Sequence, residues 1–143
     1  MCGICGFTGQ IVDRDDVIKN MTEVITHRGP DSDGFFTDDN IAMGFRRLSI
    51  IDLDAGHQPI YNEDKTLVLT FNGEIYNYKE LRKVLIQKGH KFYTDTDSEV
   101  LIHGFEEWQE DLLPRLRGMF GFAIYNTVDK SLFIARDFFG IKP

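Results

Sequence analysis

The order of the apolar segments constrains the fold of this chain more than any other feature. Strand-like segments occupy both ends, and two amphipathic helices follow each other in the middle. A doubly wound sheet needs regular alternation of strands and helices, so this order argues against one. The chain is instead predicted to be an α+β protein, one domain over residues 1–143, with antiparallel sheets and segregated helices.

The individual elements follow from the hydrophobic period and from turn residues. A strand is expected over residues 1–11. Helices are expected from Asp15 to Gly29, over 78–88 and over a segment that carries Val100 to Trp108. The last one follows a Thr96–Glu99 segment of capping-box form. Further strands are predicted around 35–36, 41–48, 66–71, 118–125 and 131–136, the last two forming a hairpin.

The charge balance narrows the class of function. The 16 Lys and Arg residues and 23 Asp and Glu residues give a net charge of −7, so no net positive field attracts nucleic acid or an anionic membrane. No apolar run approaches the ~20 residues that span a bilayer, and no secretory signal opens the chain. Two cysteines are too few for a disulfide framework, and we expect a cytoplasmic protein.

Cys2 is the first candidate for chemistry. Removal of Met1 would place a thiol and a free α-amine on one residue, with pKa values of ~8.5 and ~7.7–8.0. A nucleophile and a base would then share one carbon skeleton. The alternative is a small apolar residue at a strand start, with Met1 retained.

Cys2 and Cys5 also form a C-x-x-C pair, which could be half of a zinc site or a redox pair. A zinc site needs two more ligands, and the four histidines are scattered without a metal-binding spacing. We therefore predict no metal site and treat Cys5 as a buried small residue. No role is predicted for His57, His90 or His103.

Several polar residues elsewhere have both a purely structural and a functional interpretation. Asn72 and Gly73 form a common turn pair, but an Asn amide and a Gly N–H can also stabilise an oxyanion. Arg46 and Arg47 read as an exposed pair, although an arginine there could bind a substrate carboxylate. Asp97 could cap a helix or meet a substrate ammonium.

The order of the motifs is more specific than any one of them. Together they closely resemble the N-terminal glutaminase domain of glutamine-dependent asparagine synthetases, which are class II glutamine amidotransferases and N-terminal-nucleophile hydrolases. The motifs are MCGI, HRGPDSDG, RRLSIIDLDAGHQP, FNGEIYNY, TDTDSEVL, LRGMFGFAIY and ARDFFGIKP.

The resemblance implies a four-layer αββα sandwich of two antiparallel sheets flanked by helices. It implies that Cys2, after loss of Met1, attacks the side-chain amide of L-glutamine, with Asn72 and Gly73 as the oxyanion hole. Arg47 would hold the α-carboxylate of the substrate, and Glu74 and Asp97 would hold the α-amine of the substrate. Arg28 would support the site.

The resemblance also implies that this domain needs no cofactor, because ATP and magnesium serve only a synthetase domain that normally follows in the same chain. That domain is absent from the sequence, so we expect glutamine hydrolysis without asparagine synthesis. The alternative is a glutamine-binding or regulatory module with little turnover. The sequence leaves open whether the protein forms a homodimer.

Overall fold

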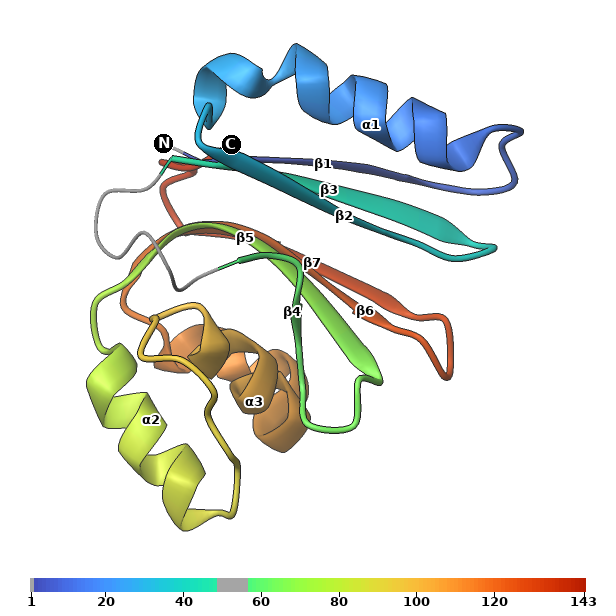
Figure 1. The fold of residues 1–143 in the computed structure, drawn as a ribbon. Coiled ribbons are helices and arrows are strands. Elements are labelled where there is room, and N and C mark those ends of the chain that lie inside the picture. The colour runs from blue at the N-terminus through green and yellow to red at the C-terminus, as the bar shows by residue number, and fades with distance from the viewer. Residues whose placement is uncertain (1, 49–56) are drawn as a thin grey trace.

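The computed structural model describes residues 2–48 and 57–143, and it has four layers. Two antiparallel sheets pack face to face, with helix α1 (Arg14–Val24) on one outer face and helices α2 (Tyr78–Gln87) and α3 (Glu99–Trp108) on the other (Figure 1). The predicted α+β class and αββα arrangement are confirmed.

The three-stranded sheet has the order β1-β3-β2. Its strands are β1 (Gly3–Thr8), β2 (Ser32–Thr37) and β3 (Ile41–Arg47), and the 3₁₀ turn Thr26–Arg28 follows α1. Helix α1 buries Ile18 and Thr22 against this sheet. The apolar stripe predicted for the helix is buried only in part, since Val24 is 76% exposed.

The four-stranded sheet has the order β4-β5-β6-β7. Its strands are β4 (Ile60–Tyr61), β5 (Leu67–Ile75), β6 (Gly118–Asn126) and β7 (Leu132–Arg136), and a 3₁₀ segment, Gln109–Arg115, links α3 to β6. One face of this sheet packs on α2 and α3 and forms the main apolar core. The predicted hairpin of β6 and β7 is confirmed.

Asn72 and Gly73 do not form the turn that the dipeptide favours. Strand β5 continues through them to Ile75, paired residue by residue with β6 up to Gly118. The apolar partner strand outweighs the local turn preference, because each residue of β5 gains a ladder position. The two-residue strand β4 has too short a signal to be predicted from sequence.

The capping box predicted at the start of α3 is wrong. Helix α3 begins at Glu99, so Glu99 is its first residue and not its third, and Ser98 makes no side-chain capping bond. The Glu99 carboxylate instead accepts backbone hydrogen bonds from Tyr93 at 2.7 Å and Thr94 at 2.9 Å. Residues 49–56, in the middle of the RRLSIIDLDAGHQP motif, lie outside the described residues.

Candidate active site

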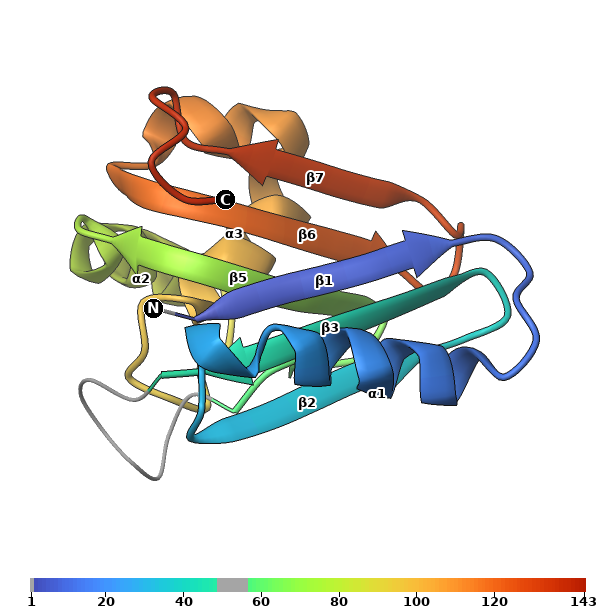
Figure 2. The same ribbon diagram turned by 90° about the horizontal axis from the view of Figure 1, so that it is seen from above.

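The N-terminus, the end of β3 and the end of β5 lie at the same edge of the sandwich (Figure 2). Cys2 precedes β1, and its Sγ lies 3.5 Å from the backbone nitrogen and 3.8 Å from the carbonyl oxygen of Leu48. The Arg28 guanidinium donates to the Cys2 carbonyl at 3.3 and 3.4 Å. Arg28 therefore fixes the backbone of Cys2, consistent with the supporting role expected for it.

The alternation of β1 decides which way Cys2 faces. Cys5 lies on the α1 side of the sheet, because a side chain on Gly44 would meet both Cys5 Sγ and Thr22 of α1. Cys2 is three residues from Cys5, so the strand period directs it to the opposite side, toward the four-stranded sheet. The two thiols cannot act as one C-x-x-C ligand pair, and burial raises the pKa of Cys5.

The two arginines at the end of β3 point to opposite faces of the sheet. Neither is exposed, so the predicted exposed pair is wrong. Arg46 donates to the Gly29 carbonyl at 2.9 Å and lies 3.7 Å from the Asp33 carboxylate. Arg47 is 7% exposed. By the strand period it shares the inner face with Met43, which lines the space between the sheets.

Asn72 has an unusual position in β5. Leu69, Phe71 and Ile75 pack into the helical core, so the strand period turns Asn72 toward the three-stranded sheet and Cys2. Its side chain is buried, and its Nδ2 has no hydrogen-bond partner among the described residues. A buried amide donor without an acceptor is costly and is typical of a position that serves a ligand.

Gly73 presents its N–H at the same edge. In an antiparallel strand, alternate N–H groups point the same way. The N–H of Phe71, two residues before Gly73, donates to Gln58 Oε1 at 2.7 Å. The N–H of Ile75, two residues after it, donates to Asp97 Oδ2 at 2.7 Å. The Gly73 N–H therefore points between these two acceptors. A side chain here would meet Met119 O of β6 at 2.1 Å, which requires glycine.

Two carboxyl groups flank the end of β5. Burial, with the nearby Glu74 carboxylate, raises the pKa of Asp97, and the Ile75 N–H only partly offsets it. The Asp97 carboxylate accepts from Ile75 of β5, and Ser98, the residue before α3, makes no side-chain capping bond. An ammonium placed between Glu74 and Asp97 would relieve their repulsion.

Gln58 is a residue that sequence reasoning missed. Its side-chain amide pairs with both backbone groups of Phe71, at 2.7 and 3.1 Å, as a neighbouring strand would. Its own carbonyl packs against Gly34 of β2, where a side chain would meet it. Gln58 thus joins the two sheets one residue before Asn72. No signal in the sequence distinguished it from a loop residue.

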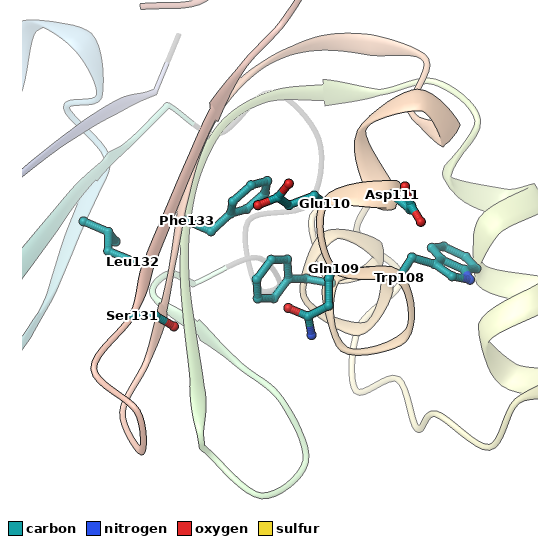
Figure 3. Close-up of a pocket in the computed structure, with 8 residues that line it drawn as sticks. Trp108, Gln109, Glu110, Asp111, Ser131, Leu132 and Phe133 are labelled. Atoms are coloured by element: carbon teal, nitrogen blue, oxygen red, sulfur yellow. The ribbon is translucent and has the colours of Figure 1, made fainter.

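The cavities show which space lies beside these residues. A cavity of about 490 Å³ between the sheets is lined by Ile4, Met43 and Thr70, which share the inner faces with Cys2, Arg47 and Asn72. A second, of about 500 Å³, lies between β7 and the segment after α3, with Trp108 and Phe133 in its lining (Figure 3). None of the candidate site residues is itself in the lining of either cavity.

The arrangement offers complementary groups at one edge of the sandwich. Cys2 and Arg47 come from one sheet and Asn72 from the other, with their side chains directed to the space between the sheets. The Gly73 N–H points along the edge of β5, between Gln58 and Asp97. A thiol, two N–H donors, one guanidinium and two carboxyl groups suit a zwitterionic substrate with a carbonyl that takes up negative charge. In the described part of the chain, no helix has the length and apolarity that a bilayer crossing requires.

Comparisons with known proteins bear on this arrangement. The family described as "Glutamine amidotransferase domain" matches residues 1–143. Glutamine-hydrolyzing asparagine synthetase 1 of Bacillus subtilis (strain 168) is 51% identical over 148 residues, which cover 98% of this chain and 23% of that protein. A glutamine-hydrolyzing asparagine synthetase of Zea mays is 44% identical over 147 residues, covering 100% of this chain and 25% of that protein.

The fold also matches a solved structure. The B. subtilis glutamine phosphoribosylpyrophosphate amidotransferase, complexed with ADP and GMP, superposes with a TM-score of 0.80 over 98% of this chain and 38% of that one. At 21% sequence identity, this likeness concerns the fold alone. The chain spans about a quarter of the length of the curated relatives it matches.

Proposed function

Because this chain belongs to the glutamine amidotransferase domain family, we propose that it hydrolyses the side-chain amide of glutamine to glutamate and ammonia, with Cys2 as the nucleophile. The observation that carries the proposal is the buried Asn72 amide, which has no hydrogen-bond partner among the described residues and faces the sheet that bears Cys2. An oxyanion would supply the missing acceptor.

The charges of the site assign the two ends of the substrate. Arg47 binds the α-carboxylate with two parallel hydrogen bonds. Glu74 and Asp97 bind the α-ammonium, whose positive charge offsets the burial of Asp97. These contacts leave the neutral side-chain amide directed at Cys2. A substrate lacking either charge would leave the buried Arg47 or the partly buried Asp97 without its counter-charge, which gives specificity for a free amino acid.

The reaction then runs in two halves. With Met1 removed, the α-amine of Cys2 takes the thiol proton as the sulfur attacks the amide carbon. The oxyanion that forms accepts hydrogen bonds from Asn72 Nδ2 and the Gly73 N–H. The α-ammonium gives its proton to the amide nitrogen as the intermediate collapses, which leaves a thioester and ammonia. Water hydrolyses the thioester to glutamate and restores the thiol.

The relatives' names suggest where the ammonia goes. They couple glutamine hydrolysis to asparagine synthesis, so we assign the ammonia to an aspartate-amidating synthetase domain. ATP and magnesium would act there. The residues of this site require neither, because the chemistry is a thiol attack with proton transfer.

Intact mass and ammonia release test the proposal. A chain that has lost Met1 should release ammonia from glutamine and gain one adduct from a glutamine-like diazoketone, whereas Cys2→Ala should do neither. Cys5→Ala is the matched control and should keep both. A processed chain with neither adduct nor ammonia would contradict the proposal.

Calorimetry separates the alternative function. A processed chain that binds glutamine but releases no ammonia would be a binding or regulatory module. Arg47→Lys should then weaken binding, since the lysine keeps the charge but loses the two-pronged contact. Steady turnover by the wild-type chain would exclude this alternative.

A further inference from the structure

A second group of side chains converges on one point, on the helical side of the four-stranded sheet. Glu63 lies between β4 and β5, His90 follows α2, and His103 and Glu106 lie one turn apart on α3. One ligand atom from each of the four lies within 4.8 Å of the others. They are separated by up to 43 residues in the chain, so no local spacing announces the group.

Four nitrogen–oxygen separations in the group are close to the edges of a small coordination polyhedron. His103 Nδ1 lies 3.2 Å from Glu106 Oε2 and 3.4 Å from Glu63 Oε2. His90 Nδ1 lies 3.5 Å from Glu106 Oε2 and 3.5 Å from Glu63 Oε1. Zinc in tetrahedral geometry, with bonds of ~2.0–2.1 Å, sets its ligand atoms ~3.3 Å apart.

A second set of contacts orients the histidines. Metal-binding histidines usually present their other ring nitrogen to a carboxylate or carbonyl. His90 Nε2 lies 3.1 Å from Glu107 Oε1, and Lys88 holds the other oxygen of Glu107 at 2.8 Å. His103 Nε2 lies 3.5 Å from Glu99 Oε1, close but without hydrogen-bond geometry. Both Nδ1 atoms are thereby left to face the centre.

The two glutamates are oriented in the same way. Glu106 Oε1 accepts a hydrogen bond from Asn62 Nδ2 at 2.8 Å, and Glu63 Oε1 accepts one from the Lys91 N–H at 2.9 Å. A cavity of about 270 Å³ lined by Asn62, Glu63 and Glu99 adjoins the group and gives an ion a route to Glu63.

The charges around the centre favour a cation. Glu63, Glu99, Glu106 and Glu107 surround two imidazoles, and among the described residues Lys88 is the one lysine paired with them. His103 is wholly buried within this group. A proton is the competing occupant. Burial opposes a charge on His103, but Glu106, Glu99 and Glu63 outweigh it and raise its pKa to about 9.

We propose that Glu63, His90, His103 and Glu106 form a structural zinc site. Four protein ligands fill a tetrahedron, so no position remains for a reacting water. The ion would join α3, the segment after α2 and the β4–β5 connection into one unit. Spacing along the chain predicted no metal site, because the ligands come from separate segments that only the fold brings together.

Zinc titration of the metal-stripped chain tests the site. The Cys2→Ala chain is used throughout, so that the N-terminal thiol does not compete for the metal. One zinc per chain is expected, together with a rise in the thermal unfolding temperature, because an ion that binds only the folded state stabilises it. Cobalt(II) should give the intense visible absorption of a tetrahedral site.

Single substitutions decide the assignment. His90 and Glu63 are partly exposed, so their side chains can be replaced without opening the core. His90→Ala and Glu63→Gln should weaken zinc binding by about 100-fold or more. Glu107→Gln, which removes the partner of a ligand, should weaken it by ~10–100-fold. His27→Ala removes an exposed histidine outside the group and should bind as the parent does. Circular dichroism checks that each variant is folded, which matters most for the buried His103→Ala.

Two results would overturn the proposal. One is a folded parent chain that takes up no zinc, which would make the group a protonated histidine network. The other is zinc binding unchanged in both His90→Ala and Glu63→Gln, which would place the ion elsewhere. Neither result bears on glutamine hydrolysis, which is measured separately in the chain that retains Cys2.

Discussion

The carboxylate of Asp97 accepts a hydrogen bond from the backbone N–H of Ile75, with Oδ2 2.7 Å from the nitrogen. This contact attaches the segment before α3 to the end of β5, two residues beyond Gly73. The same carboxylate is assigned to the substrate ammonium. Its position therefore couples substrate binding to the strand that carries the oxyanion donors.

Asp97→Asn should weaken glutamine binding with a smaller effect on kcat. The amide can still accept from Ile75, but the charge for the ammonium is lost, at a cost of ~1.5–3 kcal/mol or ~10–100-fold in KM. Steady-state kinetics measure the split. A fall in kcat at constant KM would assign Asp97 to the chemical step instead.

The raised pKa of Asp97 predicts a pH dependence of substrate binding. The folded-state pKa lies above the ordinary value of 3.8, so the neutral form appears at a higher pH than for an exposed Asp. Glutamine affinity should fall as the pH is lowered through that pKa, whereas Asp97→Asn should show no such change. Calorimetry on Cys2→Ala measures it.

Ionisation of Asp97 has opposite effects on glutamine binding, which it favours, and on the stability of the fold, which it lowers. A carboxyl group whose folded pKa is raised stabilises the fold below its unfolded pKa and loses that contribution as the pH rises through the folded value. Ionised Asp97 therefore opposes folding at neutral pH. Urea unfolding should show Asp97→Asn at least as stable as the parent, and a clear loss of stability would contradict the assigned cause.

Asn72→Ala should lower kcat by ~10²–10³ and leave KM nearly unchanged, because its amide acts on the oxyanion and not on the bound substrate. The variant should remain folded, since Asn72 Nδ2 makes no hydrogen bond among the described residues. Thr70→Val, on the same face of β5, is the control and should retain activity. An active Asn72→Ala would remove Asn72 from the oxyanion hole.

Gly73→Ala should damage both the fold and the activity. The new methyl group would lie 2.1 Å from Met119 O and 2.7 Å from Phe120 Cα, and both are backbone atoms that cannot rotate away. Strands β5 and β6 must separate locally, at a cost of ~1–3 kcal/mol or more. Urea unfolding beside Asn72→Ala tests the difference, and a Gly73→Ala chain as stable as the parent would contradict this packing.

Asp137 should make the C-terminal segment sensitive to acid. Its carboxylate accepts backbone hydrogen bonds from Phe120, Phe139, Ile141 and Lys142, at 2.9–3.2 Å. Burial opposes its charge, but these four donors outweigh that effect and lower its pKa. A lowered folded pKa stabilises the fold above the unfolded pKa, and this contribution is lost as the pH falls through the folded value.

Asp137→Asn tests this dependence. Unfolding in urea at neutral pH should show the variant less stable than the parent, and the difference should shrink in acid as the parent carboxylate takes up a proton. Asp39→Asn, at an exposed position between β2 and β3, is the control. Equal differences at both pH values would exclude ionisation of Asp137 as the cause.

Local patterns in the sequence were enough for most elements. The apolar periods predicted α1, α2 and the β6–β7 hairpin, because burial of one face requires the same spacing wherever the element lies. These patterns gave the wrong secondary structure where contacts with another segment of the chain determine it. Asn72 and Gly73 belong to a strand because β6 pairs with them. Glu99 is the first residue of α3, and its carboxylate bonds to residues 93 and 94 in place of the predicted capping contact.

By itself, the sequence determined the fold class, the family resemblance and a set of candidate residues from Cys2 to Asp97, since these depend on residue types and their order. Only the tertiary structure decided that Asn72 faces the sheet of Cys2 with a donor that has no partner among the described residues. It also decided that Gln58 joins the two sheets and that His90 and His103 meet two glutamates. These relations cross between segments distant in the chain, and packing of the two sheets and three helices alone sets them.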